Sequence, residues 1–280
     1  METAVSFFTF DMSVDYREAM DQCKKAGYDG IEPILSEDGS LNMKTTDSGL
    51  AEIKKMADDF GLKIPSVGSW NIWSNNLVSD DPKIAAYGFE IIKRQLYCAA
   101  AFGADTVLAI PGYVGTPFAE GVVSYDIAYD RSQEAITKLG EIAKELKVNI
   151  GVENVWNKFL LSPLEVRRFI DEIGNDYVGA YFDVGNIIYI GYPEQWIRIL
   201  GKRIKKLHFC DCRFDQAGLG MFVDLFEGDV DFDAVMAACE DIGYDDWAVI
   251  EFLPNYKRFP YQSIINGRLS LEKVLTIGKN

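Results

Sequence analysis

Three carboxylates and the only histidine of this 280-residue chain each lie at the end of a short apolar run that is typical of a β-strand. The runs are NIGVENV, VGAYFDVGN, IKKLHFCD and WAVIEF, and the four residues are Glu153, Asp183, His208 and Glu251. Carboxylate oxygens with one imidazole suit a divalent cation such as Mn²⁺, Mg²⁺, Co²⁺ or Zn²⁺. A single carboxylate at such a position is more often a salt-bridge partner or a cap. Four polar groups at four strand ends favour a metal site at which two glutamates can also move protons.

A second possible ligand set shares the same histidine. Alternation along a strand would place Cys210 and Cys212 on the same face as His208, which permits a His/Cys/Cys zinc site. One extended strand cannot easily wrap three ligands around one ion, and the C-x-C spacing is shorter than the usual C-x₂₋₄-C. We therefore favour the carboxylate set. We expect Asp211, between the two cysteines, to orient a ligand or to bind a substrate hydroxyl.

Aromatic and basic side chains are found near the same ends of the expected strands. Aromatic faces with polar groups between them suit a sugar, although the same residues serve equally well as packing at a rim. Basic residues there can hold a phosphate, although solvation at the surface is their commoner role. The candidate aromatic contacts are Phe7, Trp70, Trp73, Trp156 and Phe159, and the candidate cations are Lys158, Arg213, Lys257 and Arg258.

Short apolar runs alternate with amphipathic segments along the whole chain. In one such segment Leu50, Ile53 and Ala57 fall on one helical face. Alternating strands and helices predict a parallel α/β sheet, and eight such units in a chain near the typical ~250 residues predict one (β/α)8 TIM barrel over residues 1–280. An open doubly wound sheet is the alternative, but the chain has no G-x-G-x-x-G or G-x-x-x-x-G-K-[ST] loop. The expected strands are Val5–Phe10, Gly30–Leu35, Lys63–Val67, Thr106–Ile110, Asn149–Glu153, Val178–Phe182, Lys205–Phe209 and Ala248–Phe252.

Helix boundaries have their own residue types. Asp81-Pro82 and Ser162-Pro163 each combine an N-cap residue with a proline in the first turn, so each predicts the start of a helix. Glycine directly after a helical segment predicts its end. The glycines at such positions are Gly27, Gly61, Gly103, Gly174 and Gly243.

The composition excludes several classes of partner. Acidic residues outnumber basic ones by 43 to 28, giving a net charge of −15, which disfavours nucleic acid and anionic membranes. Five scattered cysteines do not form a disulfide framework. The first residues, METAVSFFTFD, lack the basic region of a signal peptide, and no apolar run approaches the ~20 residues of a membrane span. We therefore expect a cytoplasmic protein. The sequence does not specify an oligomeric state, and a homodimer or homotetramer is compatible with it.

Several longer segments resemble the sugar phosphate isomerase/epimerase family, whose TIM barrel is xylose isomerase-like and which includes ketose 3-epimerases and inosose dehydratase. The segments are GYDGIEP, FGADTVLAIPG, GVENVWNKFLLSP, GAYFDVGN, GYPEQWIRILGKRIKKLHFCD, FEGDVDF and VIEF. The resemblance implies a small-molecule sugar substrate and one divalent metal ion, for which Mn²⁺ is favoured. Carried over by position, the implied metal ligands are Glu153, Asp183, His208 and Glu251.

The ketose 3-epimerases imply a mechanism. In them two glutamates lie on opposite faces of the reacting carbon, so Glu153 and Glu251 are expected to remove and return a proton through a metal-stabilised enediolate. The implied substrate is a keto-sugar or its phosphate. Asn186 stands where those enzymes have the histidine of D-x-x-H, and Phe159 replaces an acidic substrate-binding residue. An asparagine can hydrogen-bond a substrate oxygen but cannot carry a proton at neutral pH. The expected substrate contacts are Asn186, Asp211, Trp70, Trp156, Lys158, Arg213 and Phe7.

Two other functions use the same residues. A metal-dependent dehydratase of an inosose-like substrate would use the same base but expel a hydroxyl group. A metal-binding barrel subunit without turnover is the third interpretation, against which the intact ligand set argues. A single histidine excludes the endonuclease-IV-like members of the family, which need several for three zinc ions, and xylose isomerase proper, which also relies on more than one.

Overall fold

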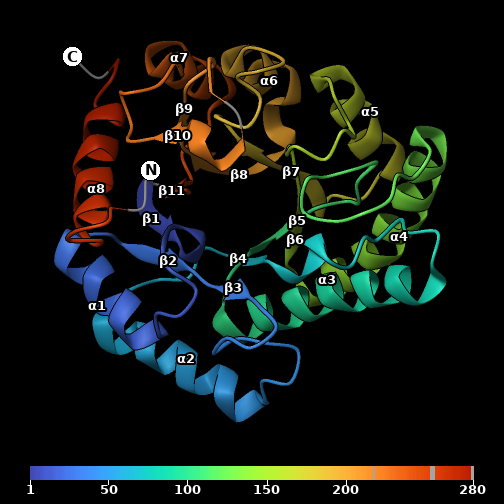
Figure 1. Ribbon diagram of the computed structural model, residues 1–280, viewed down its shortest axis with the longest axis horizontal. Coiled ribbons are helices and arrows are strands. Elements are labelled where there is room, and N and C mark those ends of the chain that lie inside the picture. The colour runs from blue at the N-terminus through green and yellow to red at the C-terminus, as the bar shows by residue number, and fades with distance from the viewer. Residues whose placement is uncertain (217, 253–255, 279–280) are drawn as a thin grey trace.

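The computed structural model of the protein describes residues 1–216, 218–252 and 256–278. It shows a ring of parallel strands surrounded by helices (Figure 1). The neighbours in the ring follow the order β2-β1-β11-β8-β7-β6-β5-β4-β3. This arrangement confirms the predicted TIM barrel. The strands of the ring are β1 (Glu2–Ser6), β2 (Gly30–Glu32), β3 (Ile34–Leu35), β4 (Ser66–Ser69), β5 (Thr106–Ala109), β6 (Asn149–Glu153), β7 (Val178–Asp183), β8 (Ile204–Phe209) and β11 (Trp247–Ile250).

The ring closes through a strand that Pro33 divides into β2 and β3. β2 pairs with β1, and β3 pairs with β4, so the two pieces together occupy one strand position. Proline has no N–H to give to a ladder, which interrupts the strand at this residue. The next amide, that of Ile34, donates to the hydroxyl of Tyr16 at 3.1 Å instead. Nine short strands therefore correspond to the eight that the sequence predicts.

The helices begin and end at the residue types that predict their boundaries. Asp81 accepts a hydrogen bond from the amide of Lys83, and Ser162 accepts one from the amide of Glu165. All five expected glycines have the left-handed conformation that ends a helix. The helices are α1 (Tyr16–Ala26), α2 (Asp47–Phe60), α3 (Pro82–Phe102), α4 (Tyr125–Leu146), α5 (Pro163–Ile173), α6 (Pro193–Leu200), α7 (Phe232–Ile242) and α8 (Gln262–Val274). None of the described helices is both long and apolar enough to cross a bilayer.

Side chains alternate between two environments along the barrel strands. Phe182 on β7 stacks on Trp196 of α6, so it packs in the apolar layer between strands and helices. Its neighbour Tyr181 packs against His208 and hydrogen-bonds Ser66. These three polar side chains come from three different strands and are fully buried, which gives the barrel a polar interior. Such an interior needs internal hydrogen bonds and provides the support for a polar site.

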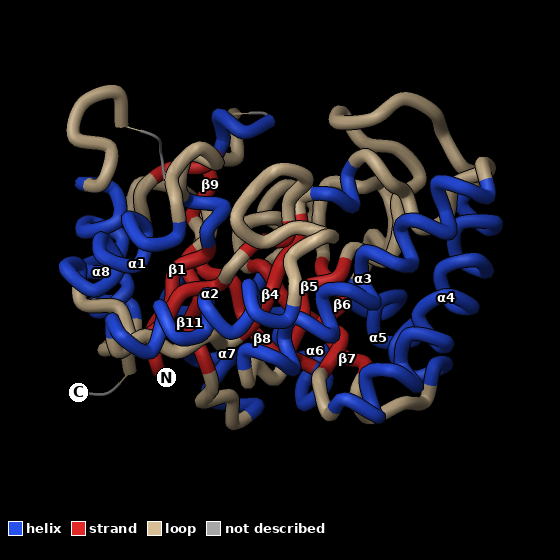
Figure 2. Tube along the Cα trace, turned by 90° about the horizontal axis from the view of Figure 1, so that it is seen from below, coloured by secondary structure: helices blue, strands red, loops and turns tan. Residues whose placement is uncertain are grey.

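Most of the long loops rise from one end of the barrel, opposite the end at which the two termini lie (Figure 2). Because all the barrel strands run in parallel, this loop-rich end is the end at which the strands finish. Active sites of TIM barrels lie at this end. The loops contain the 3-10 helices η1 (Phe7–Thr9), η2 (Asn71–Trp73) and η4 (Gly218–Met221), and a hairpin of β9 (Asp211–Cys212) and β10 (Phe222–Val223); η3 (Gly201–Arg203) precedes β8.

Candidate metal centre

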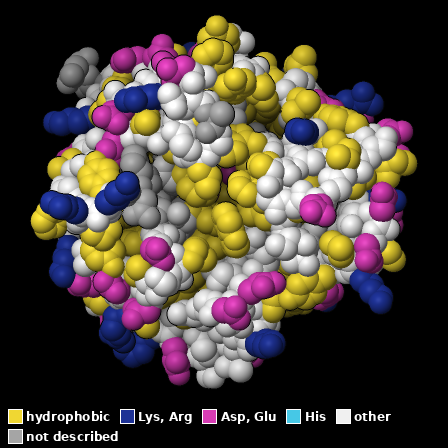
Figure 3. All heavy atoms as spheres, in the orientation of Figure 1, with side chains coloured by type: hydrophobic (Ala, Val, Ile, Leu, Met, Phe, Trp, Pro, Cys, Tyr) yellow, Lys and Arg dark blue, Asp and Glu magenta, His cyan; other side chains and the backbone are white. Residues whose placement is uncertain are grey.

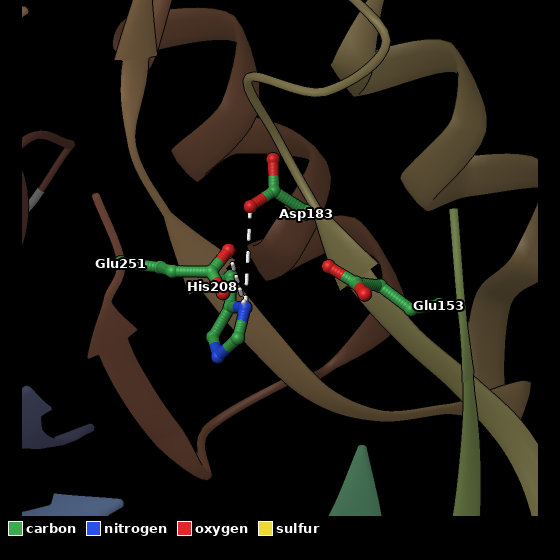
Figure 4. Close-up of side chains that lie close together, drawn as sticks. All are labelled: Glu153, Asp183, His208 and Glu251. Carbon is green, nitrogen blue, oxygen red and sulfur yellow. Dashed lines mark ion pairs between the residues drawn. The ribbon is translucent and has the colours of Figure 1, made fainter. Parts of the chain in front are cut away.

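Glu153, Asp183, His208 and Glu251 converge at the end of the barrel, and we call them the acidic floor. Each offers one ligand atom, and these four atoms lie within 4.8 Å of one another. Glu153 and Asp183 end β6 and β7, His208 is the penultimate residue of β8, and Glu251 directly follows β11. Figure 4 shows their polar ends directed to a common space. Glu153 and Glu251 are 6% and 3% exposed, and the other two are fully buried. The predicted convergence of these side chains is therefore present.

Glu32 on β2 determines how His208 presents its ring. Glu32 Oε1 lies 3.1 Å from His208 Nε2, while its Oε2 accepts hydrogen bonds from Ser66 Oγ at 2.5 Å and Tyr181 OH at 2.8 Å. The carboxylate therefore binds the Nε2–H of the imidazole, which leaves Nδ1 to face the acidic floor. Nδ1 lies 3.1 Å from Glu251 Oε2 and 4.0 Å from Asp183 Oδ2, but it is a buried atom without an aligned hydrogen bond.

The loop after β7 fixes the carboxylate of Asp183. Oδ1 accepts the backbone N–H groups of Gly185 at 2.8 Å and Asn186 at 2.7 Å, and the thiol of Cys210 lies 3.1 Å away. Asn154 holds the backbone of Asp183 from the other side with two hydrogen bonds, of 2.8 Å and 3.0 Å. With Oδ1 occupied in this way, Oδ2 is the oxygen nearer to His208, at the common space.

Negative charge accumulates in the acidic floor. Burial and the charge of Glu251 raise the pKa of the Asp183 carboxyl to about 7 and hold the pKa of Glu153 well above its ordinary value. Burial lowers the pKa of His208, but the charges of Glu251 and Glu32 outweigh it, so this pKa lies well above its ordinary value. Among the described residues, no Lys or Arg side chain makes an ion pair with these carboxylates. Buried carboxylates in this state require a cation or protons.

The donor set fits a divalent ion. Bonds of ~2.0–2.3 Å place ligands on opposite sides of one ion about 4–4.6 Å apart, close to the separation in the acidic floor. Three carboxylates with one imidazole match Mn²⁺, Mg²⁺, Co²⁺ or Zn²⁺, and the unpartnered Nδ1 offers its lone pair at the right place. The fit rests on these side chains and does not distinguish among the four metals.

Seven aromatic rings form a continuous series around the pocket above the floor, and we call this series the aromatic belt. Consecutive rings have centroids 5.0–6.1 Å apart. Figure 3 shows apolar side chains around a central hollow in which acidic atoms are visible. The belt runs through Trp156, Phe222, Phe252, Phe8, Trp70, Phe118 and Trp73, all of which line the pocket together with Glu153 and Glu251.

An unusual backbone conformation brings Glu251 and Phe252 to the same pocket. Along a regular strand, successive side chains point to opposite faces, so Phe252 would point toward the helices. Phe252 instead has a φ of 49°, in the left-handed region that costs a residue with a bulky side chain about 1–2 kcal/mol. Both side chains line the pocket as a result. The strained conformation of Phe252 therefore allows a floor residue and the belt residue that follows it to line one pocket.

Three of the expected substrate contacts line the pocket. Trp70 and Trp156 belong to the belt, and Asn186 lies beside the floor, with its Nδ2 3.4 Å from Glu153 Oε1. Trp73, also an aromatic candidate, lies in the belt too.

The structure places the other four expected contacts elsewhere. Phe7 is 3% exposed and packs against Phe10 and Tyr16 in the core. The Asp211 carboxylate accepts four backbone N–H groups of its own loop, at 2.9–3.2 Å, so it holds that loop together and is not free to bind a hydroxyl. Lys158 is exposed outside the pocket lining, and Arg213 lies beside Glu227 at the surface.

Three further candidates also lie outside the pocket. Phe159 is buried against Tyr125 and Phe169, while Lys257 and Arg258 are exposed.

The structure does not support the alternative zinc site formed by His208, Cys210 and Cys212. Cys210 and Cys212 pack in a small apolar cluster with Met221 and Phe222, and burial raises the pKa of the Cys210 thiol well above its ordinary value. The Cys210 thiol donates to Asp183 and so supports a floor residue. Gly185 allows this contact, since a Cβ there would lie 2.5 Å from the Cys210 sulfur.

Sequence reasoning missed Glu32 and four belt residues, namely Phe8, Phe118, Phe222 and Phe252. Glu32 interrupts the apolar run GIEPIL directly before Pro33, which was an available signal for a buried carboxylate. Phe118 and Phe222 lie in long loops whose sequence has no periodicity to place them.

Comparisons with known proteins agree on the fold. The family described as Xylose isomerase-like TIM barrel matches residues 20–263. Inosose dehydratase of Geobacillus thermodenitrificans is 26% identical over 224 residues, covering 71% of this chain and 72% of that protein. Two similar inosose dehydratases from Lacticaseibacillus casei are matched over only 56% of their length. Ketose 3-epimerase of Arthrobacter globiformis is 23% identical, covering 84% and 76%. The crystal structure of the IOLI protein with a zinc atom superposes with a TM-score of 0.76 at 19% identity, covering 99% and 98%.

Proposed function

Because the chain belongs to the xylose isomerase-like TIM-barrel family, we propose that it is a divalent-metal-dependent isomerase or epimerase of a keto-sugar. The acidic floor would hold the metal, with Mn²⁺ as the expected ion and Mg²⁺, Co²⁺ or Zn²⁺ as alternatives. The observation that carries the proposal is the pair Glu153 and Glu251. They come from different strands, approach the common space from two sides and line the same pocket (Figure 4).

The bound cation would polarise the substrate carbonyl and stabilise negative charge on its oxygen. A carboxylate alone is too weak a base to remove a proton from a C–H bond beside an unassisted carbonyl. With that assistance, one glutamate can remove the proton and the other can return a proton from the opposite side, which inverts the carbon. Burial and the charge of Glu251 raise the pKa of Glu153 above its ordinary value, which favours the protonated form of this side chain.

The remaining pocket residues would orient the substrate and exclude water. Asn186 presents an amide beside Glu153 and can hydrogen-bond a hydroxyl next to the reacting carbon. The aromatic belt encloses the space above, so that proton transfer takes place in an apolar environment where charges interact strongly.

A dehydratase is the second candidate, favoured by the inosose dehydratases among the curated relatives. It would use the same metal and the same base, but a hydroxyl on the neighbouring carbon would leave as water. Asn186 bears on this choice, because an asparagine cannot protonate the departing hydroxyl and one of the glutamates would have to do so.

NMR of candidate keto-sugars in D₂O with the Mg²⁺-loaded protein tests the proposal. Deuterium entering the carbon beside the carbonyl, with no loss of water, is the expected result. Loss of water with a new double bond would instead support the dehydratase. If neither change occurs with any sugar although the metal is bound, the protein is a metal-binding subunit without turnover, and the proposal fails. A sample stripped with a chelator is the control for metal dependence.

A further inference from the structure

The pocket contains very few groups that can bind a sugar hydroxyl. Apart from Glu153 and Glu251, the side chains with polar atoms that line it in the described part of the chain are Ser69, Asn186 and three tryptophans, each of which has a single indole N–H donor. Ser69 Oγ already donates to the carbonyl of Leu35 and accepts the amide of Asn71, both at 3.2 Å. Among the described lining residues above the floor, Asn186 is thus the side chain that remains able both to donate to and to accept from a hydroxyl, whereas the indoles can only donate. A free hexulose has several hydroxyls, and each one buried without a partner weakens binding.

The same pocket offers no cation to a phosphate. In the part of the chain that the structure describes, no Lys or Arg lines it. The four basic residues that could approach the mouth, namely Lys158, Arg213, Lys257 and Arg258, are all exposed outside the lining. The net charge of −15 also disfavours the approach of an anion. The phosphate of a phosphorylated sugar therefore finds no Lys or Arg partner among the described lining residues.

The walls are suited to a different chemical group. All seven belt rings and the aliphatic residues Leu108, Ile110, Val155 and Leu219 line the space above Glu153 and Glu251. Flat rings favour stacked or edge-on contact with another ring or with C–H groups, and burying apolar surface favours binding. Trp70, at the mouth, is 37% exposed, so part of this surface is open to a ligand.

We infer that the substrate is an uncharged keto-sugar that carries an apolar substituent, such as an alkyl or aryl group attached through a glycosidic bond. The sugar ring would lie at the acidic floor with Asn186 beside it, and the substituent would pack against the aromatic belt. This inference rests on the proposed function of the same site, which it narrows from keto-sugars in general to one class.

Calorimetry with the Mg²⁺-loaded protein and four probes tests the inference. The probes are D-fructose, D-fructose 6-phosphate, and the methyl and phenyl glycosides of a 3-keto-glucose. We expect the phenyl glycoside to bind at least ~10-fold more tightly than the methyl glycoside. We also expect the phosphate to bind no more tightly than fructose. Tighter binding of the phosphate, or equal binding of the two glycosides, would overturn the inference.

Trp70→Leu isolates the contribution of the belt. This variant should lose most of the preference for the phenyl glycoside, whereas Phe214→Leu should keep it. Phe214 is also an exposed aromatic residue, 56% exposed and stacked on Tyr189, but it does not line the pocket. An unchanged preference in a folded Trp70→Leu protein would contradict the assigned role.

Deuterium exchange separates this inference from the proposed function. If the phenyl glycoside binds with the expected preference but neither exchanges deuterium nor loses water, the substrate class stands and the catalytic proposal fails. If fructose or its phosphate exchanges deuterium while the phenyl glycoside does not bind, the catalytic proposal stands and the substrate class fails.

Discussion

The acidic floor takes its side chains from the ends of barrel strands, whereas the aromatic belt takes its rings from loops, 3-10 helices and a hairpin. Floor residues are at most 6% exposed. His208 is held by its hydrogen bond to Glu32, and Asp183 by hydrogen bonds from Asn154 and from the backbone amide of Asn186. Belt residues range from buried Trp73 to Trp70, which is 37% exposed. The same pocket therefore combines a rigid polar base with walls that depend on the conformation of the loops.

This difference suggests a division of labour. Atoms that bind a metal or move a proton need positions fixed to a fraction of an ångström, and strand ends in a closed ring supply them. Apolar contacts with a substrate tolerate small displacements, so loops can supply them. The following predictions test whether the floor controls the chemistry while the belt controls binding.

The largest effect should come from the two glutamates. Glu153→Gln and Glu251→Gln should each reduce turnover by about 10²–10⁴-fold, because an amide cannot accept the proton. Rates should be compared at matched metal content, measured by elemental analysis. Glu227→Gln, at the surface beside Arg213, is the matched control and should keep normal turnover. If either floor variant kept near-normal turnover with metal bound, the two-base mechanism would be wrong.

Glu32→Gln should weaken metal binding about 10–100-fold, because the neutral amide no longer fixes the Nε2–H form of His208. Calorimetric titration with Mn²⁺ measures the affinity. ¹⁵N NMR of the Zn²⁺-loaded protein reports the tautomer, and the single histidine gives unambiguous signals. Ser66→Ala removes another partner of the same carboxylate and should have a smaller effect. Unchanged affinity in Glu32→Gln would show that this carboxylate does not position the ring.

Metal removal should make stability depend on pH in a defined direction. The raised pKa of Asp183, about 7, and the raised pKa of His208 mean that the metal-free folded state binds protons more tightly than the unfolded chain. Their contribution to stability is therefore present at low pH and lost as the pH rises through these folded-state values. Metal binding displaces the protons, so the stabilisation by Mn²⁺ should grow from about pH 5 to about pH 8.

Thermal melts with EDTA or with MnCl₂ over this range measure that stabilisation. Glu153→Gln, which lacks one of the carboxylates, should show a weaker dependence on pH. An equal shift of the melting temperature by Mn²⁺ at both ends of the range would refute the assignment of these residues as ligands.

The smallest effect should come from substitutions of two neighbouring phenylalanines, one of which belongs to the belt and the other to the core. Phe8→Leu removes a belt ring and should raise the KM for a substrate with an apolar substituent by about 2–10-fold. Phe7→Leu alters only the core and should lower the free energy of unfolding by roughly 1–2 kcal/mol with little change in KM. Steady-state kinetics and urea unfolding distinguish them. A larger KM effect in the Phe7 variant would place the wrong residue in the belt.

The same two residues show where sequence reasoning stops. The apolar run predicts a strand over Val5–Phe10, but β1 ends at Ser6 and η1 begins at Phe7. A helical turn does not follow the alternation of a strand, so Phe8 and not Phe7 lines the pocket. Phe252 was missed for a related reason, because its left-handed φ reverses the expected direction of its side chain.

The barrel and the position of the acidic floor could be predicted because hydrophobic periodicity marks each strand and hence each strand end. Asn149–Glu153 is the clearest example, since the predicted strand and β6 have the same bounds. Loop conformation depends on contacts between distant segments, so the role of Asp211 in binding amides up to Val230 could not be predicted. Glu32 could have been predicted, as a lone acid in an otherwise apolar strand.

The position of the belt on segments outside the barrel strands has a practical consequence for protein engineering. A combinatorial library at the seven belt positions would alter the walls while leaving the barrel ladder and the catalytic groups unchanged. Trp70 and Trp156 are the natural starting points, because both are incompletely buried and tolerate new side chains more readily than Phe222, which packs with the two cysteines. If the proposed function holds, selection from such a library would change which substituents the pocket accepts without redesign of the acidic floor.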